Sequence, residues 1–239
     1  MVDLPKMRFA NRLISTLPAE AIAALAPLLE PVMLEVRQSI ELPGKPISHV
    51  YFVETGMISV VAKSEGQRGT EVGMIGSEGV TGCSIALGDD RSALETFVQI
   101  PGRALRVPAS DFISLLSQHP TLQNLMMRYA RVLWIQATST ALANVNAKLE
   151  ARLARWLLMM HDRMDGNGIN ITHEFLALML HARRPGVTVA LHVLEGEHLI
   201  ESRRGELVVK DREGLLRFSD GTYGTPDAEY ERLIGSAAT

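Results

Sequence analysis

Residues 171–200 read ITHEFLALMLHARRPGVTVALHVLEGEHLI, and this stretch decides the fold of the C-terminal part of the chain. Thr172 suits the N-cap of a first helix, and Pro185 suits the first turn of a second one. The connector between them, at residues 181–183, is short. Two short helices joined by three or four residues predict a helix-turn-helix.

A wing is predicted by the residues that follow. Residues 202–209 read SRRGELVV, which is typical of a β-hairpin with Gly205 in its turn. The first residues of the second helix of such a motif reach base edges in the major groove, where arginine pairs with guanine and also binds phosphate. Arg183 and Arg184 fall at that position, and wing arginines suit backbone contacts. The predicted DNA contacts are Thr172, Arg183, Arg184, Pro185, Gly186, Thr188, Arg203 and Arg204.

The charge of this region leaves a second interpretation open. Residues 171–217 contain seven Arg or Lys and seven Asp or Glu, so the predicted domain is neutral. The whole chain carries a net charge of −3. A local basic face is enough for DNA binding. A small-molecule or protein-interaction module with degenerate DNA binding therefore stays an alternative.

The N-terminal part has the texture of short strands. A short helix with a break at Pro27 is expected over residues 18–30. β-branched and aromatic residues then recur up to residue 107, with Gly and Pro between them. A hairpin is expected at Thr55–Gly56, and a further split at Pro101–Gly102. This spacing predicts an antiparallel barrel or sandwich of roughly eight strands.

A long helix is predicted from Pro120, after a short one at residues 109–118. Its apolar residues follow a 4-3-4-3 step, which favours a dimer seam, although packing against its own barrel would give the same pattern. The seam residues are Leu122, Met126, Tyr129, Leu133, Gln136 and Thr140. The expected domains are an effector domain at 1–118, this helix at 119–145, a DNA-binding domain at 146–225 and a tail at 226–239.

Composition excludes several classes of protein. The chain has 239 residues and one cysteine, Cys83, so neither an intramolecular disulfide nor an iron–sulfur cluster held by several cysteines is expected. No run of eighteen apolar residues and no targeting signal is present, which predicts a soluble cytoplasmic protein without a membrane partner. No nucleophile–base constellation, P-loop or metal cluster is recognisable, so an enzyme is not expected.

Three segments together resemble the Crp/Fnr family of bacterial transcription regulators. They are VYFVETGMIS at residues 50–59, LEARLARWLL at 149–158, and residues 171–200. The resemblance implies an α+β protein with an N-terminal cyclic-nucleotide-binding-like barrel of jelly-roll type, a long dimerisation helix and a C-terminal winged helix-turn-helix. It also implies a homodimer on double-stranded DNA, base contact by Arg184 and, as a candidate partner, RNA polymerase. His181 departs from the glycine often found in the connector of such motifs.

The same resemblance suggests an effector site, whose candidate residues are Gly82, Cys83, Arg91, Ser92 and Thr138. Arg91–Ser92 resembles the phosphate-binding pair of nucleotide-binding members. Their Gly-Glu pair would fall at Gly82–Cys83, so the glutamate that binds ribose is lost. Half of the adenine-contacting Thr-Ser pair is also lost, because it would fall at Ala137–Thr138. A cyclic nucleotide stays a candidate cofactor, but we expect no cAMP control of the usual kind.

The sequence also bears on other possible input signals. A haem would need axial ligands in the barrel, where His49 is the only histidine before His119. Cys83 could serve as a redox-sensitive thiol if it were exposed and had a lowered pKa, although a lone cysteine is more often a small buried side chain. An unknown small molecule, or no effector at all, completes the alternatives.

Overall fold

The computed structural model describes residues 9–63, 69–164, 166–203 and 205–235. Its N-terminal helices and strands have the following bounds: α1 Arg12–Ser15, α2 Ala19–Leu25, η1 Ala26–Leu28, β1 Glu30–Leu34, β2 Ser39–Glu41, β3 His49–Ala62, β4 Thr70–Ile75, α3 Cys83–Ala86, β5 Glu95–Pro108 and α4 Ala109–Gln118. The short helix with its break near Pro27 and the helix over residues 109–118 are where the sequence predicts them.

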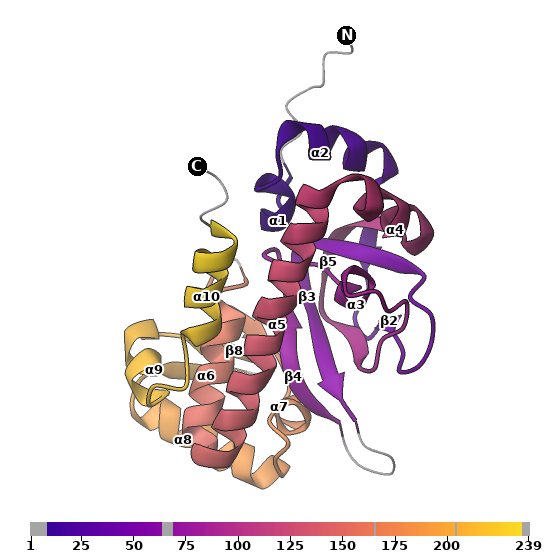
Figure 1. Ribbon diagram of the computed structural model, residues 1–239. Helices are drawn as coiled ribbons and strands as arrows, with labels where there is room; N and C mark the ends of the chain where they lie inside the picture. The colour runs from indigo at the N-terminus through magenta and orange to yellow at the C-terminus, as the bar shows by residue number, and fades with distance from the viewer. Residues whose placement is uncertain (1–8, 64–68, 165, 204, 236–239) are drawn as a thin grey trace. The chain divides into compact units, whose positions relative to one another are not determined.

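The N-terminal strands form one antiparallel sheet of jelly-roll type, in the order β1-β5-β3-β4, with β2 paired to β5 (Figure 1). Five strands occur here among the described residues, fewer than the roughly eight strands predicted for the barrel or sandwich, and the sheet does not close into a barrel. The predicted hairpin at Thr55–Gly56 is wrong, because β3 continues through it for 14 residues. The predicted split at Pro101–Gly102 is wrong in the same way, because β5 also has 14 residues.

Two glycines explain how these long strands pass each other without breaking. A Cβ on Gly102 would lie 2.1 Å from the carbonyl oxygen of Thr55, and one on Gly56 would lie 2.6 Å from that of Ile100. Gly56 also has φ +82°. Glycine inside a strand marks such close backbone approaches as well as turns. The glycines therefore mark a close approach of two neighbouring strands and not a turn.

Aromatic side chains fill the interior next to this sheet. Phe52 on β3 and Phe112 on α4 are fully buried and meet edge to face, with ring centroids 5.9 Å apart. Tyr129 is also buried, and a Cβ on Gly79 would clash with its hydroxyl group. Such pairs add stabilisation beyond the apolar area that they bury. The helices on either side of the strands are therefore held by large rings at fixed positions.

Helix α5, Pro120–Asn146, has two apolar faces. The predicted seam lies on the face turned into the chain: Leu122, Met126, Tyr129 and Gln136 are at most 2% exposed. The side chain of Gln136 accepts a hydrogen bond from the amide of Met74. Leu133 and Thr140 are half-buried. Four of the six predicted seam residues are thus buried within the chain, which is one source of their periodicity.

The opposite face of α5 exposes large apolar side chains. Met127, Trp134, Leu142 and Val145 are 40%, 62%, 63% and 83% exposed. Successive residues of an α-helix are about 100° apart, which places these four on the side away from the buried face. The four residues are separated by 7, 8 and 3 positions, so they recur on one side of the helix.

The C-terminal elements are α6 Leu149–His161, β6 Gly168–Asn170, α7 His173–Met179, α8 Arg184–Gly196, β7 Ile200–Arg203, β8 Glu206–Val209, α9 Arg212–Phe218 and α10 Thr225–Leu233. β7 and β8 form the expected hairpin, and β6 adds a third strand beside β8. The fold class is confirmed: helices with an antiparallel sheet, one long helix and a winged helix-turn-helix. Strand β6 and helix α9 were not predicted.

Contacts divide the chain into two compact units. One contains Met1–Ile58, Ile75–Arg131 and Tyr230–Thr239, and the other contains Ser59–Met74 and Val132–Glu229. The end of β3 and most of β4 thus belong to the same unit as the helix-turn-helix. Within the described residues, no helix is both long enough and apolar enough to cross a membrane.

Candidate nucleic-acid interface

The inner face of α8 anchors the candidate recognition helix. Its four inward side chains, Val187, Ala190, Leu191 and Leu194, are fully buried. They pack against α6, on which Leu153, Ala154, Leu157 and Leu158 are also fully buried. A Cβ on Gly186 would lie only 3.3 Å from Leu149, so glycine suits the close approach of the two helix starts. The helix is therefore fixed by its apolar face, and its other face is left for contacts.

The turn between α7 and α8 sets the direction of α8. His181 has φ +46°, which is the left-handed conformation considered for this connector. Its Nδ1 lies 3.0 Å from the hydroxyl of Thr70. Thr172 caps α7 by accepting a hydrogen bond from the amide of Phe175 at 3.2 Å. The motif is thus built from one cap and one strained turn residue.

The outer face of α8 begins with two exposed arginines, Arg183 and Arg184, followed by exposed Pro185. Within the part of the chain that the structure describes, neither arginine forms an ion pair. Thr188 is half-buried, and its hydroxyl contacts His173 Nδ1 and the carbonyl of Arg184, both at 3.2 Å. The two arginines therefore present uncompensated charge at the N-terminal end of the helix, where a backbone phosphate or a base edge is bound most readily.

The wing presents its charge differently. Arg203 is exposed but lies 3.0 Å from Glu201 and 3.8 Å from Glu206, and Lys210 lies 3.1 Å from Glu201. Hydrogen bonds from Arg203 and Lys210 lower the pKa of Glu201 to about 2. The predicted contact Arg204 lies outside the described residues. The positive charge of Arg203 is therefore already balanced within the wing.

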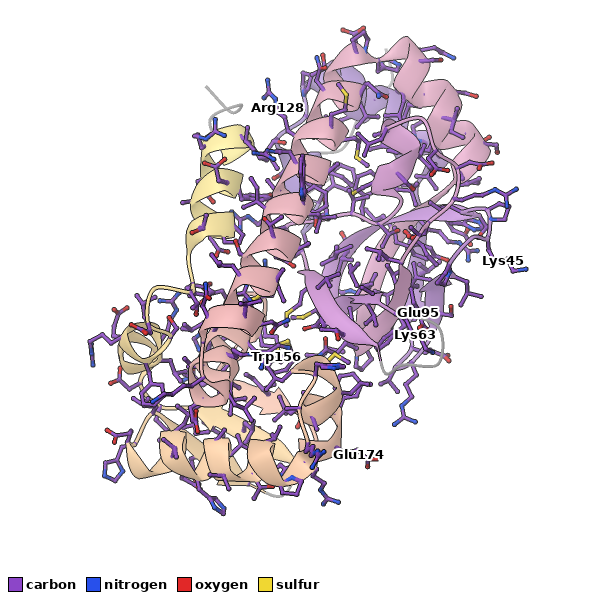
Figure 2. All side chains as sticks on the ribbon, turned by 60° about the horizontal axis from the view of Figure 1, so that its bottom comes forward. Lys45, Lys63, Glu95, Arg128, Trp156 and Glu174 are labelled. Atoms are coloured by element: carbon purple, nitrogen blue, oxygen red, sulfur yellow. The ribbon has the colours of Figure 1, made fainter. Side chains whose placement is uncertain are left out.

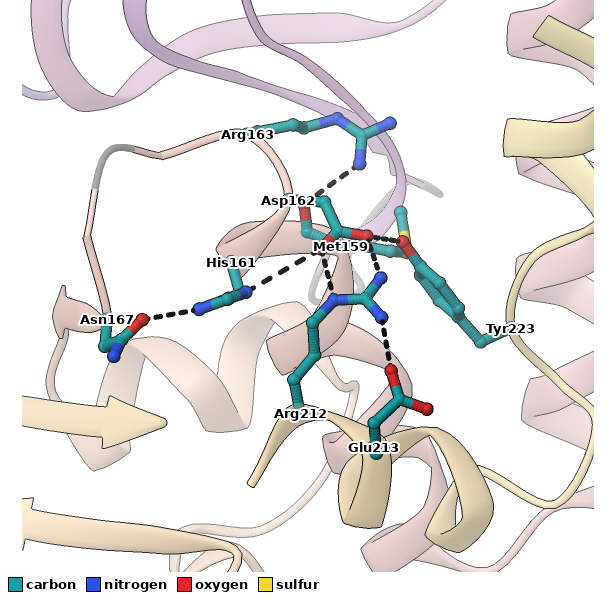
Figure 3. A network of polar contacts seen from close by, with 8 residues as sticks. All are labelled: Met159, His161, Asp162, Arg163, Asn167, Arg212, Glu213 and Tyr223. Atoms are coloured by element: carbon teal, nitrogen blue, oxygen red, sulfur yellow. Dashed lines mark hydrogen bonds and ion pairs between the residues drawn. The ribbon is translucent and has the colours of Figure 1, made fainter. Parts of the chain in front are cut away.

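A polar network ties the end of α6 to the segment after the wing (Figure 3). Asp162 accepts two hydrogen bonds from Arg212, at 2.8 and 2.7 Å, and a third from the hydroxyl of Tyr223. Burial alone would raise the pKa of Asp162, but these hydrogen bonds outweigh it and lower the pKa below its usual value. His161 lies on the other side and contacts Asn167 at 2.9 Å. This network fixes α9 and the wing sheet against α6.

A second polar centre lies deeper in the same unit. Glu71 on β4 is 5% exposed and accepts a hydrogen bond from Trp156 Nε1 at 2.7 Å and another from the hydroxyl of Ser59. Trp156 belongs to α6 and is labelled in Figure 2. Burial raises the pKa of Glu71 to about 7, although the two hydrogen bonds and the nearby Arg155 and Arg163 oppose the shift. A carboxyl group thus joins strands β3 and β4 to helix α6.

Two of the proposed effector residues, Gly82 and Ser92, contact the buried carboxyl group of Glu41. Glu41 is 9% exposed, and its Oε1 accepts a hydrogen bond from the amide of Gly82 at 2.7 Å. Burial raises the pKa of Glu41, while the hydrogen bonds from Gly82 and Ser92 oppose the rise. Gly82 has φ +70° and is the N-cap of α3. The backbone amide that a nucleotide phosphate could use is therefore occupied by a side chain of the same protein.

The remaining effector candidates point elsewhere. Arg91 donates a hydrogen bond to the carbonyl of Gly44 at 3.0 Å and lies 3.7 Å from Asp90. The thiol of Cys83 is partly buried and donates to the carbonyl of Val80, and burial together with Glu41 raises its pKa. Thr138 is exposed on α5, and its hydroxyl donates to its own helix. A raised pKa disfavours the thiolate that redox sensing needs.

Comparison with known proteins agrees with this geometry. Residues 151–218 match the Crp-like helix-turn-helix domain. The family model thus covers the C-terminal helix-turn-helix region of the chain. No curated protein matches the sequence at a significant level. Solved structures with the same fold include FixK2 from Bradyrhizobium japonicum, with TM-score 0.69 and 16% identity over 80% of this chain and 96% of that one.

Two further structures share the fold. One is the c-di-GMP-responsive global regulator CLP from Xanthomonas campestris, with TM-score 0.64 and 16% identity over 87% of this chain and all of that one. The other is a CRP-family transcriptional regulator from Thermus thermophilus, with TM-score 0.64 and 18% identity over 80% of this chain and 97% of that one. At sequence identities of 16–18%, this structural similarity establishes a shared fold and nothing about ligands.

Sequence reasoning missed both buried carboxyl groups. Glu41 and Glu71 sit in strands with ordinary neighbours, and nothing in their local sequence distinguishes them from solvent-facing glutamates. Their donors, Gly82 and Trp156, are 41 and 85 residues away. Only the long-range pairing of the strands and helices brings donor and acceptor together.

The buried Glu71 predicts a pH-dependent stability. Because its pKa rises from the usual 4.5 to about 7 on folding, the native protein binds a proton that the unfolded chain lacks between these values. Its contribution to stability therefore falls as pH rises through this window, by about 3 kcal/mol. We expect Glu71→Gln, which keeps the shape, to remove this part of the slope in urea unfolding measured from pH 4.5 to 8. Exposed Glu20→Gln is the control. Parallel curves for wild type and Glu71→Gln would contradict the assignment.

Proposed function

We propose that this protein is a homodimeric, sequence-specific DNA-binding transcription regulator whose N-terminal sheet is not controlled by cAMP. The observation that carries the proposal is the two-faced helix α8, with four side chains fully buried against α6 and two unpaired arginines at its exposed N-terminal end. That end is the part of a recognition helix that reaches bases. RNA polymerase is the candidate partner of the DNA-bound dimer.

The dimer is proposed on the exposed face of α5 formed by Met127, Trp134, Leu142 and Val145. Exposed apolar rows of this size mark interfaces more often than free surface. Their spacing suits a helix-to-helix seam with a second copy of the chain. Such a dimer would bind two half-sites about one helical turn of DNA apart.

The absence of cAMP control is proposed from Glu41. Its carboxylate already accepts a hydrogen bond from the Gly82 amide and lies beside Ser92. A phosphate brought to the same amide would place a second negative charge against it, and repulsion between buried like charges is costly. Arg91, which would have to neutralise a phosphate, is engaged by Gly44 and Asp90 instead. These contacts favour another effector or none.

The alternative is a binding module with degenerate DNA recognition. One observation favours it: the arginine of the wing that the structure describes, Arg203, is balanced by Glu201 and Glu206. A module of this kind would bind DNA weakly and without sequence preference. The two interpretations differ in the dependence of DNA affinity on salt, because real phosphate contacts give a steep negative slope.

Arg184 provides the direct test of DNA recognition. We expect Arg184→Ala to lower the affinity for a site selected from random DNA by about 1–3 kcal/mol and to relax the base preference at one position per half-site. Fluorescence anisotropy across a salt series measures both quantities. Arg217→Ala serves as the control, because Arg217 is 73% exposed but lies on α9 near Asp211. Unchanged affinity and base preference in Arg184→Ala would sink the assignment.

A charged substitution on the exposed face of α5 tests the proposed dimer interface. We expect Trp134→Glu to convert the dimer to a monomer at micromolar concentration, because a carboxylate buried in an apolar seam has no partner. Light scattering coupled to gel filtration measures the mass. Met33→Glu is the matched control, since Met33 is 67% exposed on β1. A Trp134→Glu variant that stays dimeric would show that another surface joins the subunits.

Because the amide of Gly82 already donates a hydrogen bond to Glu41, the protein is predicted not to respond to cAMP. We expect millimolar cAMP to leave the melting temperature and DNA affinity of the wild type unchanged. Glu41→Ala removes the competing carboxylate, so any gain in nucleotide binding should occur in this variant and be absent from the exposed control Glu35→Ala. Tighter specific DNA binding by the wild type with cAMP would contradict the proposal.

A further inference from the structure

The exposed face of α8 is apolar beyond its arginines. Val189 is 58% exposed and Val193 is 38% exposed, and Pro185 lies one turn before Val189 on the same side. His192 completes this face. β-branched residues are not favoured by helix propensity. Because Val189 is exposed, packing within the chain does not explain its presence at this position.

This face carries no carboxylate along most of its length. Residues 184–194 contain neither Asp nor Glu. The first acidic residue, Glu195, is half-buried and accepts a hydrogen bond from the amide of Ser202 at 2.8 Å, so it is directed to the wing. A negatively charged DNA backbone can therefore approach the helix without repulsion from this element, and Arg183 and Arg184 attract it.

Major-groove chemistry offers one apolar group for such a surface. Thymine alone projects a 5-methyl group there, and apolar side chains recognise it by contact. We propose that Val189, with Pro185 beside it, reads the 5-methyl group of a thymine in each half-site. This inference rests on the proposed DNA-binding function and adds a specificity-determining residue to it.

The position of the thymine follows from the helix geometry. Val189 lies five residues after Arg184, which is about 7.5 Å along the helix axis. Base pairs are 3.4 Å apart along the duplex. The recognised thymine therefore lies within about two base steps of the pair bound by Arg184. A protein partner bound to this face would bury Val189 as well. In that case, removal of a single methyl group from DNA would not change the affinity for DNA.

The test uses the full-length protein and duplexes of its selected site in which one thymine at a time is replaced by deoxyuridine. This exchange removes the methyl group and keeps base pairing. We expect one replacement per half-site to weaken wild-type binding about 3- to 5-fold, as burial of one methyl group would. Val189→Ala should bind the two duplexes equally. Val36→Ala, 60% exposed on the other unit, should discriminate like the wild type.

The outcomes separate this inference from the proposed function. If no sequence is selected and binding has a shallow salt slope, the regulator itself is wrong and the inference falls with it. If specific, salt-dependent binding occurs but no deoxyuridine replacement changes it, the protein is a DNA-binding regulator and the role of Val189 is overturned. The role is also overturned if replacing the same thymine by deoxyuridine weakens binding of Val189→Ala as much as it weakens binding of the wild type.

Discussion

The packing of α8 against α6 is the contact on which the rest of the DNA-binding unit depends. Val187, Ala190, Leu191 and Leu194 have no exposed surface, so the rotation of α8 about its own axis is fixed. A helix with one face fully buried exposes only the opposite face to solvent. The burial of the apolar face of α8 therefore determines that Arg184 and Val189 point outward.

Two internal carboxyl groups show how polar contacts connect segments distant in sequence. A buried carboxyl group is costly unless hydrogen bonds compensate it. Glu71 is compensated by Trp156 and Ser59, and Glu41 by Gly82 and Ser92. The hydrogen bonds of Glu71 join strands β3 and β4 to α6. The hydrogen bond to Glu41 occupies the amide of Gly82 at the start of α3, so similar hydrogen bonds join strands to a helix at one place and close a helix N-terminus at the other.

The limits of prediction from sequence follow from the range of the interactions. The helix-turn-helix and wing were predictable because each is specified by residues within about thirty positions of one another. His181 could be recognised as a departure from glycine, and its φ of +46° agrees with that interpretation. By contrast, the periodicity of α5 revealed an apolar face without revealing what covers it. Gly56 and Gly102 were predicted as strand breaks, because the local sequence does not distinguish a turn from a close approach of two strands 46 residues apart.

The charge distribution argues that recognition is concentrated in α8. Arg203 and Lys210 both pair with Glu201, so these two cations have little charge left to offer a phosphate. Arg183 and Arg184, in contrast, would exchange water for phosphate or base without first breaking an ion pair. In the proposed function, a neutral domain can bind DNA specifically because two cations that form no ion pair among the described residues, and the apolar face beside them, lie on one helix. Affinity in such an arrangement comes from few phosphate contacts, and sequence preference must come mainly from the side chains of that helix.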